Sequence, residues 1–274
     1  MNTQKQINLD LYKKFLDTKR PLEDCIVRKL ETELKTSYIY HSNAIEGNTL
    51  TLKETDVILE YGITVKGKSL QEHLEVKGQE YAVNFLKEEV KHRTELNIEL
   101  IKNFHSLILS GIDPLHAGTF KKYSNFIGGT NVQTVSPFQV EYELNQLIEK
   151  YNKDTNNNLI EKIAKFHADF EKIHPFSDGN GRTGRLIMNF ELMKKGYPIC
   201  IIRNEDRLEY YDSLELAQTK KDYSKIISFI TTSLEHTFEF YFKHLSQDWK
   251  KELAEFQRIK TPFQKKEKDK EIER

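Results

Sequence analysis

The sequence predicts a mainly α-helical protein. Glycine and proline, which interrupt helices, number only 12 and 6 among 274 residues. Over long stretches, apolar residues recur every three or four positions, the spacing that places them on one face of a helix. A single stretch, residues 126–135, combines short apolar runs with turn residues as a β-hairpin does.

The composition is that of a folded protein with a charged surface. Hydrophobic residues make up 38% of the chain and charged residues 31%, while 42 basic and 42 acidic residues cancel. We therefore expect no general attraction to nucleic acid or membranes. No stretch approaches the ~18 apolar residues of a membrane helix, and the N-terminus does not read as a signal peptide. Two distant cysteines favour the cytoplasm, although a secreted effector would have the same composition.

The first predicted helix covers roughly residues 21–46. Its apolar residues near one face are Val27, Leu30, Leu34, Tyr38 and Ile45. Gly47 is placed to end it in the left-handed conformation common after helices. The same periodicity predicts helices over residues 52–59, 70–90 and 98–109.

The predicted hairpin comes next, before Ser136 and Pro137. Gly128-Gly129 and Thr130-Asn131 lie between short apolar runs, which indicates a turn joining two strands. An ordinary surface hairpin is the alternative to a functional one.

Two more helices are predicted in the second half, over residues 159–173 and 186–194. The first has apolar residues with period 3.6, and Gly196 and Pro198 stop the second. The tail, residues 250–274, is rich in charge and is expected to be an exposed helix that frays into disorder. A partner-binding role for this tail is the alternative.

The most informative stretch is the run from His174 to Arg185. An unperturbed histidine has a pKa of ~6.5, so His174 can exchange a proton near neutral pH. Asp178 supplies the hard oxygen that Mg²⁺ prefers. These two residue types are suited to removing a proton beside a magnesium-bound substrate.

The rest of the run is suited to phosphate. Gly179 and Gly181 allow the backbone N–H groups to approach an anion closely. Arg182 and Arg185 supply planar donor groups that match phosphate oxygens. The helix that follows would also point its N-terminal N–H groups at the phosphates.

Two other interpretations of the run are weaker. Gly179, Gly181 and Gly184 satisfy the bare GxGxxG dinucleotide pattern, but a helix and not a strand precedes them. A surface turn rich in glycine and arginine would explain only a shorter fragment. The chain has no Walker A sequence, so P-loop chemistry is not supported.

The run resembles the signature of the Fic family, His-x-Phe-x-Asp/Glu-Gly-Asn-Gly-Arg-x-x-Arg. Every specified position is matched, by His174, Phe176, Asp178, Gly179, Asn180, Gly181, Arg182 and Arg185. Members of this family are mostly adenylyltransferases, which move AMP from ATP onto a protein hydroxyl. The resemblance covers roughly residues 36–235 and implies a Fic-type helical bundle with a β-hairpin flap over the active site.

The resemblance also implies a division of the chain and roles for its residues. The expected parts are an N-terminal helical region with an inhibitory helix (1–95), a Fic core (96–235) and a charged helical extension (236–274). His174 would be the catalytic base and Asp178 the Mg²⁺ ligand. The implied nucleotide-binding residues of the run are Asp178, Gly179, Asn180, Gly181, Arg182, Thr183, Gly184 and Arg185.

Two further segments are implied to complete the nucleotide site. The hairpin would place Ile127, Gly128, Gly129 and Thr130 over the nucleotide and metal, and Tyr210, Tyr211 and Gln218 would surround the adenine. Relatives often have asparagine where this chain has Gln218. The upstream Gly118-Thr-Phe-Lys121 departs from the commoner Gly-x-Tyr-Arg, which weakens any specific role for Lys121. Half-buried packing is the alternative role for either tyrosine.

Ser42-Asn-Ala-Ile-Glu46-Gly47 matches a second Fic hallmark, the inhibitory motif Ser/Thr-x-x-x-Glu-Gly/Asn. A carboxylate at position 46 could form a bidentate pair with Arg185 and occupy the place of the γ-phosphate of ATP. The alternative is a solvated Glu46 at a helix end, capped by Gly47.

The sequence thus predicts a protein adenylyltransferase that modifies a Ser, Thr or Tyr hydroxyl and is autoinhibited by Glu46. Its expected partners are Mg²⁺, ATP and a protein target, with self-modification, a homodimer and removal of AMP as further expectations. No membrane or nucleic-acid partner is expected. The alternatives are transfer of another phosphate-containing group and a non-catalytic nucleotide sensor.

Overall fold

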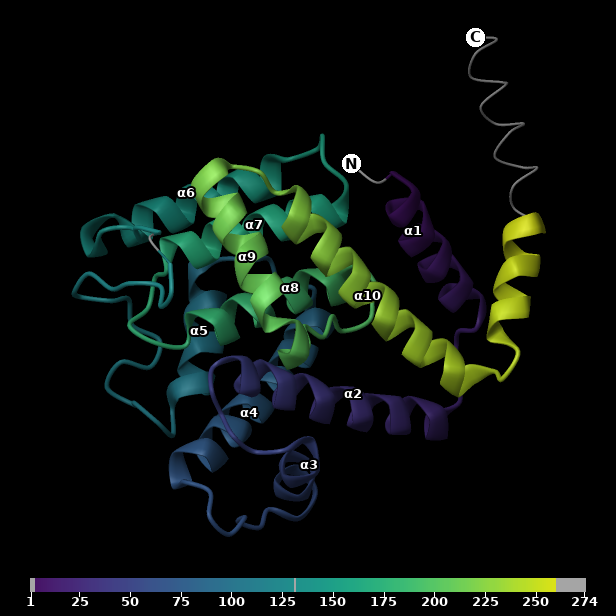
Figure 1. Cartoon of the computed structure of the whole chain (residues 1–274), viewed down its shortest axis with the longest axis horizontal. Helices are drawn as coiled ribbons and strands as arrows, with labels where there is room; N and C mark the ends of the chain where they lie inside the picture. The colour runs from purple at the N-terminus through teal and green to yellow at the C-terminus, as the bar shows by residue number, and fades with distance from the viewer. Residues whose placement is uncertain (1–2, 131, 260–274) are drawn as a thin grey trace.

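The computed structural model describes residues 3–130 and 132–259 and confirms the mainly helical class. The α-helices, shown in Figure 1, are α1 (Thr3–Thr18), α2 (Asp24–Ile45), α3 (Leu52–Tyr61), α4 (Leu70–His92), α5 (Ile98–Leu109), α6 (Val140–Lys153), α7 (Leu159–Ile173), α8 (Asn180–Lys194), α9 (Arg207–Lys220) and α10 (Ser224–Leu245). Short 3-10 helices, η1 (Pro137–Gln139) and η2 (Asn204–Asp206), precede α6 and α9. Residues 249–259 are also helical.

Helix α8 lies at the centre of the bundle and carries the second half of the His174–Arg185 run at its N-terminus (Figure 1). It packs against α2, α4, α5 and α7. Leu186, Phe190 and Leu192 are fully buried, and so are polar residues such as Asn189. Because every face of α8 is covered, its first turn is held rigidly beneath the ends of α2 and α7.

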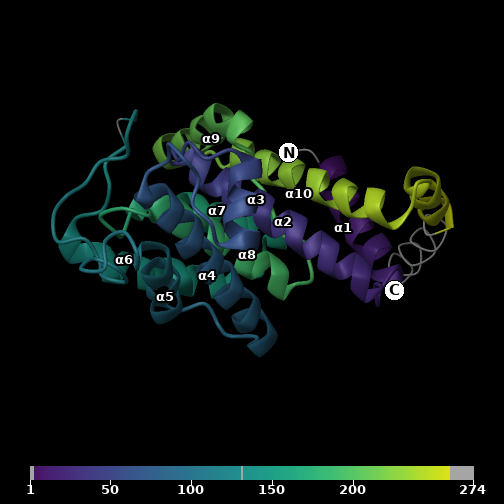
Figure 2. The same ribbon diagram turned by 90° about the horizontal axis from the view of Figure 1, so that it is seen from below.

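The two ends of the molecule differ in character. Helices α1 and α10 and the helix over residues 249–259 gather at one end, and the long connection between α5 and α6 lies at the other (Figures 1 and 2). Aromatic rings join the first end: Phe15 packs edge-on against Phe242, and Trp249 packs against the same ring. The tail is helical up to residue 259, as predicted. Its remaining residues, 260–274, lie outside the described residues.

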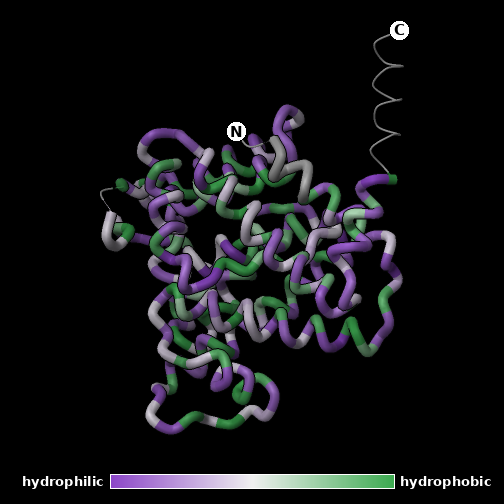
Figure 3. The backbone as a smooth tube through the Cα atoms, turned by 45° about the vertical axis from the view of Figure 1, so that its right-hand side comes forward, coloured by the Kyte–Doolittle hydropathy of each residue, from purple (hydrophilic) through white to green (hydrophobic). Residues whose placement is uncertain are grey.

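Local sequence signals explain where several helices begin. Thr51 and Ser69 each cap a helix and form a reciprocal capping box with a glutamate three residues on. Asn158 caps α7 through its side chain, and Gly47 follows α2 with φ 99°, as predicted. Hydrophobic and hydrophilic residues alternate along the helices (Figure 3), because the helices around α8 bury only one face.

Two of the predicted elements differ in the structure. The helix expected from residue 186 already begins at Asn180, so the Gly-Asn-Gly turn belongs to its first turn. The expected hairpin is reduced to one antiparallel bridge between Phe126 and Gln133, and the described residues contain no strand. A two-stranded ribbon is marginally stable by itself, and this one has no third strand to pair with.

No helix within the described residues combines the length and the apolar character needed to cross a membrane.

Candidate active site

A cavity of about 350 Å³ lies where α2, α7, α8, α9 and the segment 126–130 meet. Most of the predicted site is brought together here. The predicted residues that line it are Glu46, Gly47, Ile127, Gly128, Thr130, His174, Gly181, Arg185, Tyr210, Tyr211 and Gln218. Glu171, Arg207 and Phe126 line it as well. The predicted residues outside its lining are Ser42, Gly129, Asp178, Gly179, Asn180, Arg182, Thr183 and Gly184.

His174 ends α7 in a left-handed conformation, with φ 51° and ψ 60°. This conformation is unusual for a residue other than glycine, and such residues cluster at functional sites. The ring Nδ1 lies 3.2 Å from the Glu171 backbone carbonyl. A carbonyl only accepts hydrogen bonds, so Nδ1 must carry the proton and Nε2 keeps a free lone pair. Burial lowers the pKa of His174, so the ring is neutral at pH 7.

Arg185 is 1% exposed, and the C-terminal turn of α2 satisfies its guanidinium. Nη2 donates to Glu46 Oε1 at 2.7 Å and to the Ser42 carbonyl at 2.8 Å. Nε donates to Ser42 Oγ at 3.1 Å. Ser42 and Glu46 are four residues apart, which places both on one face of the helix. The predicted meeting of Glu46 and Arg185 is present, through a single carboxylate oxygen and not as a bidentate pair.

Electrostatics reinforce this contact. Burial by itself would lower the pKa of Arg185, but the Glu46 carboxylate raises it above its usual value. The guanidinium is therefore charged, and it needs an anion because an unpaired buried charge is costly. In this structure Glu46 is that anion.

Gly181 allows the Glu46 carboxylate to lie against the first turn of α8. A Cβ atom at this position would be 2.3 Å from Glu46 Oε1. The first N–H groups of a helix lack partners within the helix and attract anions. The carboxylate thus occupies a place where a phosphate oxygen would also be stabilised.

Three residues of the run are engaged inside the protein. Asn180 accepts a hydrogen bond from the Phe176 N–H at 2.9 Å and donates to the Phe176 carbonyl at 2.8 Å, so its amide shapes the turn. Thr183 is fully buried. A Cβ on Gly184 would be 2.2 Å from Glu171 Oε1. The side chains of Asn180 and Thr183 therefore face the protein interior and do not line the cavity.

Asp178 and Arg182 lie beside the cavity. The Asp178 side chain is 69% exposed; its Oδ1 accepts from the Gly179 N–H at 2.6 Å and its Oδ2 from Arg182 at 3.3 Å. Arg182 is 3% exposed, and its Nε and Nη1 have no hydrogen-bond partner among the described residues. Nη1 also lies 3.9 Å from Glu75 Oε1, but the open donors of this buried guanidinium still suit an additional anion.

This donor set fits a magnesium ion that arrives with a polyphosphate. No group of three or more His, Cys, Asp or Glu side chains within residues 3–130 and 132–259 could hold a metal. Magnesium sites often use one or two carboxylates and take their other ligands from phosphates and water. The open carboxylate of Asp178, beside Arg182 and a helix N-terminus, meets that requirement.

The predicted adenine residues line the α9 wall of the cavity and form hydrogen bonds to residues of α7 and α2. The buried Tyr210 hydroxyl lies 2.7 Å from His167 Nε2, and the Tyr211 hydroxyl donates to the Ile45 carbonyl at 3.2 Å. Gln218 donates to the Ala168 carbonyl at 3.3 Å. Tyr210 is therefore a packing residue as well as a wall of the cavity, and Tyr211 fastens α9 to the end of α2.

Sequence reasoning missed several residues that support the run. His105 stacks on Phe176 with ring centroids 3.7 Å apart, accepts from the Gly118 N–H and donates to the Asp178 carbonyl at 3.0 Å. Asn125 donates to the Phe176 carbonyl at 2.8 Å.

Lys121 is a further supporting residue. It is 4% exposed, and its Nζ donates to Asn125, Thr134 and the Ile173 carbonyl. Only the departure of Lys121 from the family pattern offered a signal, since these contacts join segments distant in sequence.

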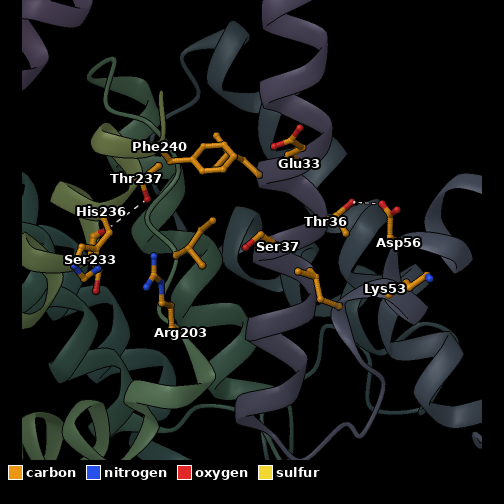
Figure 4. Close-up of a pocket in the computed structure, with 13 residues that line it drawn as sticks. Glu33, Thr36, Ser37, Lys53, Asp56, Arg203, Ser233, His236, Thr237 and Phe240 are labelled. Atoms are coloured by element: carbon orange, nitrogen blue, oxygen red, sulfur yellow. Dashed lines mark hydrogen bonds between the residues drawn. The ribbon is translucent and has the colours of Figure 1, made fainter. Parts of the chain in front are cut away.

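A second cavity of about 450 Å³ lies between α2, α3 and α10. Figure 4 shows Ser37 of α2 facing Thr237 and Phe240 of α10 across it, whereas Thr36 turns toward Asp56 of α3 and donates a hydrogen bond to it at 3.3 Å. It is lined by none of the predicted site residues. The smaller cavity is therefore the candidate active site, because it holds the histidine, the arginine and the helix N-terminus.

The fold and the cavity together define a helical domain in which a histidine, a buried arginine and a helix N-terminus meet. Residues 95–192 match the Fic/DOC family. The solved structure of Fic-1 (residues 134–508) from Caenorhabditis elegans superposes with a TM-score of 0.79 at 31% identity, covering 88% of this chain and 72% of that one. A Fic domain containing signaling protein from Bacteroides thetaiotaomicron gives a TM-score of 0.81 at 25% identity, covering 86% and 96%.

Curated relatives agree. Protein adenylyltransferase fic-1 of C. elegans is 38% identical over 195 residues, which are 70% of this chain and 38% of the relative. Protein adenylyltransferase Fic of Drosophila grimshawi is 34% identical, over 78% of this chain and 44% of the relative. The chain belongs to the Fic/DOC family. It spans less than half the length of these curated relatives.

Proposed function

We propose that this chain is a protein adenylyltransferase, which transfers AMP from ATP to a Ser, Thr or Tyr hydroxyl of a protein and releases pyrophosphate. The observation that carries the proposal is the meeting of His174, the N-terminus of α8 and Arg185 in one cavity. The names of the curated relatives support the same activity.

His174 would act as the general base. Its pKa is lowered by burial, and the Glu171 carbonyl fixes the tautomer that leaves Nε2 free. Nε2 can then accept the proton of the incoming hydroxyl as its oxygen attacks the α-phosphorus. General-base catalysis of this kind contributes ~10²–10⁴-fold.

The phosphates would lie along the start of α8. Backbone N–H groups at Gly181 and its neighbours can stabilise the oxygens, while Arg182 and Arg185 bind the outer phosphates. Asp178 would hold Mg²⁺, which when bound neutralises charge on the polyphosphate. Tyr210, Tyr211 and Gln218 would form the adenine wall.

Glu46 would be a brake built into the same chain. It occupies the Arg185 side of the anion site, so the γ-phosphate of ATP competes with it. ATP bound beside Glu46 would present its α-phosphorus in an orientation unsuited to attack. Removing Glu46 should therefore raise the rate of transfer.

The segment 126–133 would act as the flap that receives the target. Ile127, Gly128 and Thr130 line the cavity, Gly129 turns the chain, and Phe126 is 87% exposed beside them. The hairpin would complete its pairing when a target segment adds to it.

We also propose that the protein is located in the cytoplasm, that the chain has the three parts given above, and that it modifies itself and forms a homodimer.

Radiolabelled nucleotides test the proposed reaction. Wild type, Glu46→Gly and Glu46→Gly/His174→Ala are incubated with a lysate and with either α-³²P or γ-³²P ATP. We expect label in protein from α-³²P ATP only, strongest with Glu46→Gly and absent without His174. Label from γ-³²P ATP would indicate phosphate transfer. ATP binding in a calorimeter without any label would indicate a nucleotide sensor.

Glu46 could also serve in removal of AMP. Its carboxylate lies beside Arg185, from which it could activate a water molecule against the α-phosphorus, and His174 would return the proton to the leaving hydroxyl oxygen. To test this role, AMP-modified target is incubated with each protein and free AMP is measured. We expect release of AMP with wild type but not with Glu46→Gly. Equal release by both proteins would leave Glu46 a purely inhibitory role.

A further inference from the structure

Glu171 is a buried carboxyl group that no step of the proposed transfer uses. It lies in the last turn of α7, is 6% exposed and lines the active-site cavity. Within the described residues its side chain forms no ion pair, and its Oε1 is buried without a hydrogen-bond partner. Buried glutamates are almost always paired, so this one calls for an explanation.

Gly184 makes room for this carboxyl group. A Cβ at position 184 would be 2.2 Å from Glu171 Oε1, so the carboxyl lies directly on the backbone of the residue before Arg185. The Fic signature leaves position 184 free. In this chain the glycine is therefore explained by Glu171 and not by a nucleotide.

The groups that face Glu171 come from four helices. They are His167 and His174 of its own helix, Arg185 of α8, Glu46 at the end of α2, and Tyr210 of α9. Three more residues of α9 line the same cavity: Arg207, Tyr211 and Glu215. His167 is bound to Tyr210, and burial lowers its pKa to about 3, so it carries no charge. Arg185 is the cation that acts on Glu171, and Glu46 already holds it.

Two carboxylates thus compete for one guanidinium. Burial raises the pKa of Glu171 to about 8, Arg185 opposes this rise and Glu46 adds to it. At pH 7 Glu171 is therefore a neutral acid while Glu46 is bound. Withdrawing the charge of Glu46 lowers the pKa of Glu171, and a new anion at Arg185 raises it again.

We propose that Glu171 is a positioning residue that keeps Arg185 available to one anion at a time, taking a proton from solvent when an anion binds Arg185 and releasing it when that anion leaves. The proposal rests on the proposed function in one respect, that the second anion is a phosphate of ATP. Glu46 and the nucleotide would then exchange on Arg185 without Glu171 joining either of them.

Proton uptake on nucleotide binding tests this exchange. MgATP is titrated into each protein at pH 8 in two buffers with different heats of ionisation. The second pKa of a phosphate group is about 6, so ATP itself stays ionised. For Glu46→Gly we expect up to about half a proton taken up per nucleotide, because Glu171 changes from mostly ionised to about half protonated at this pH. For Glu46→Gly/Glu171→Gln we expect none.

Wild type should take up less, since Glu46 already keeps Glu171 about half protonated at pH 8. Equal uptake with and without Glu171, or nucleotide binding by Glu46→Gly with no uptake, would overturn the proposal. Failure of every variant to bind ATP would instead contradict the proposed function.

A measurement without nucleotide keeps the proposal testable in that case. Thermal unfolding of wild type and Glu171→Gln is followed from pH 5 to pH 9. A carboxyl whose pKa is raised in the folded state loses its contribution as the pH rises from ~4.3, the ordinary value, through about 8. The midpoint temperature of Glu171→Gln should therefore gain on wild type up to pH 8 and no further.

Glu149→Gln on the exposed surface of α6 is the matched control and should run parallel to wild type at every pH. Parallel curves for Glu171→Gln and wild type would show that Glu171 titrates normally, and the proposal would be wrong.

Discussion

The two ends of the stretch from Asp178 to Arg185 differ in how fully the protein satisfies them. At one end Arg185 is 1% exposed and holds three hydrogen bonds from α2. At the other end the Asp178 side chain is 69% exposed and bonds only within the run. The arginine end is closed by the chain's own carboxylate, while the aspartate end stays open for ions and substrate. In the proposed function, control and ligand capture would thus be assigned to opposite ends of this stretch.

His174 precedes this stretch and lines the same cavity as Arg185, and its loss should have the largest effect. In the Glu46→Gly background, His174→Ala should reduce AMP transfer by at least ~10²-fold, because a positioned general base contributes that much. Nucleotide affinity, measured by calorimetry, should stay nearly unchanged since the imidazole acts on the hydroxyl. Retention of more than a tenth of the activity would remove His174 from this role.

Opening the arginine end should produce the largest gain. Glu46→Gly removes a charged hydrogen bond worth ~1.5–3 kcal/mol, so productive ATP binding and AMP transfer should rise roughly 10- to 100-fold. The rate is measured with α-³²P ATP at several MgATP concentrations.

Glu46→Gln is the control for that substitution. Glu46 caps α2 just before Gly47, so a second glycine would also loosen the helix end. The glutamine variant keeps the helix end while removing the charge. Equal rates of wild type and both variants at saturating MgATP would show that Glu46 is no brake.

The same comparison shows how far sequence reasoning reached. The contact of Glu46 with Arg185 could be predicted because Ser42 and Glu46 are four residues apart at the end of one helix and Arg185 belongs to a fixed motif. Helix α7 could be predicted to the residue because apolar periodicity and the Asn158 cap agree. Helix α6 has the same periodicity, with apolar residues at 140, 144, 147, 148 and 151, but no side-chain cap, and it was missed.

What could not be predicted depends on contacts between distant segments. Nothing near Glu171 in sequence reveals that its carboxyl lies on Gly184, and nothing near His105 reveals the Asp178 carbonyl it holds. The flap was expected as two strands from its turn residues. Strand pairing depends on neighbours that the described part of this chain does not supply, so only one bridge forms.

The pH dependence of transfer reports the base directly. Burial, with a smaller contribution from Lys121, lowers the pKa of His174 below 6.5. Since the base must be unprotonated, the rate of Glu46→Gly should rise with pH and reach half its maximum below pH 6.5. Initial rates between pH 5 and pH 7.5 provide the measurement. A midpoint above pH 7 would mean that a different group limits the rate.

Lys121→Met should give the smallest effect and links the base to the flap. Lys121 lies between the Ile173 carbonyl and the two residues that flank the flap, Asn125 and Thr134. Its charge disfavours the protonated form of His174. Burial lowers the pKa of Lys121 to about 8, so it is charged throughout the acid range.

Its removal should raise the pKa of His174 and move the acid midpoint of Glu46→Gly to higher pH by less than ~1 unit. The rate at pH 6 should therefore fall relative to that at pH 7.5. Losing the bond to a buried carbonyl should also cost about 1–3 kcal/mol of unfolding free energy, measured by urea denaturation. Lys122→Met, an exposed neighbour, is the matched control and should change neither quantity. An unchanged midpoint in Lys121→Met would show that Lys121 supports the flap without tuning the base.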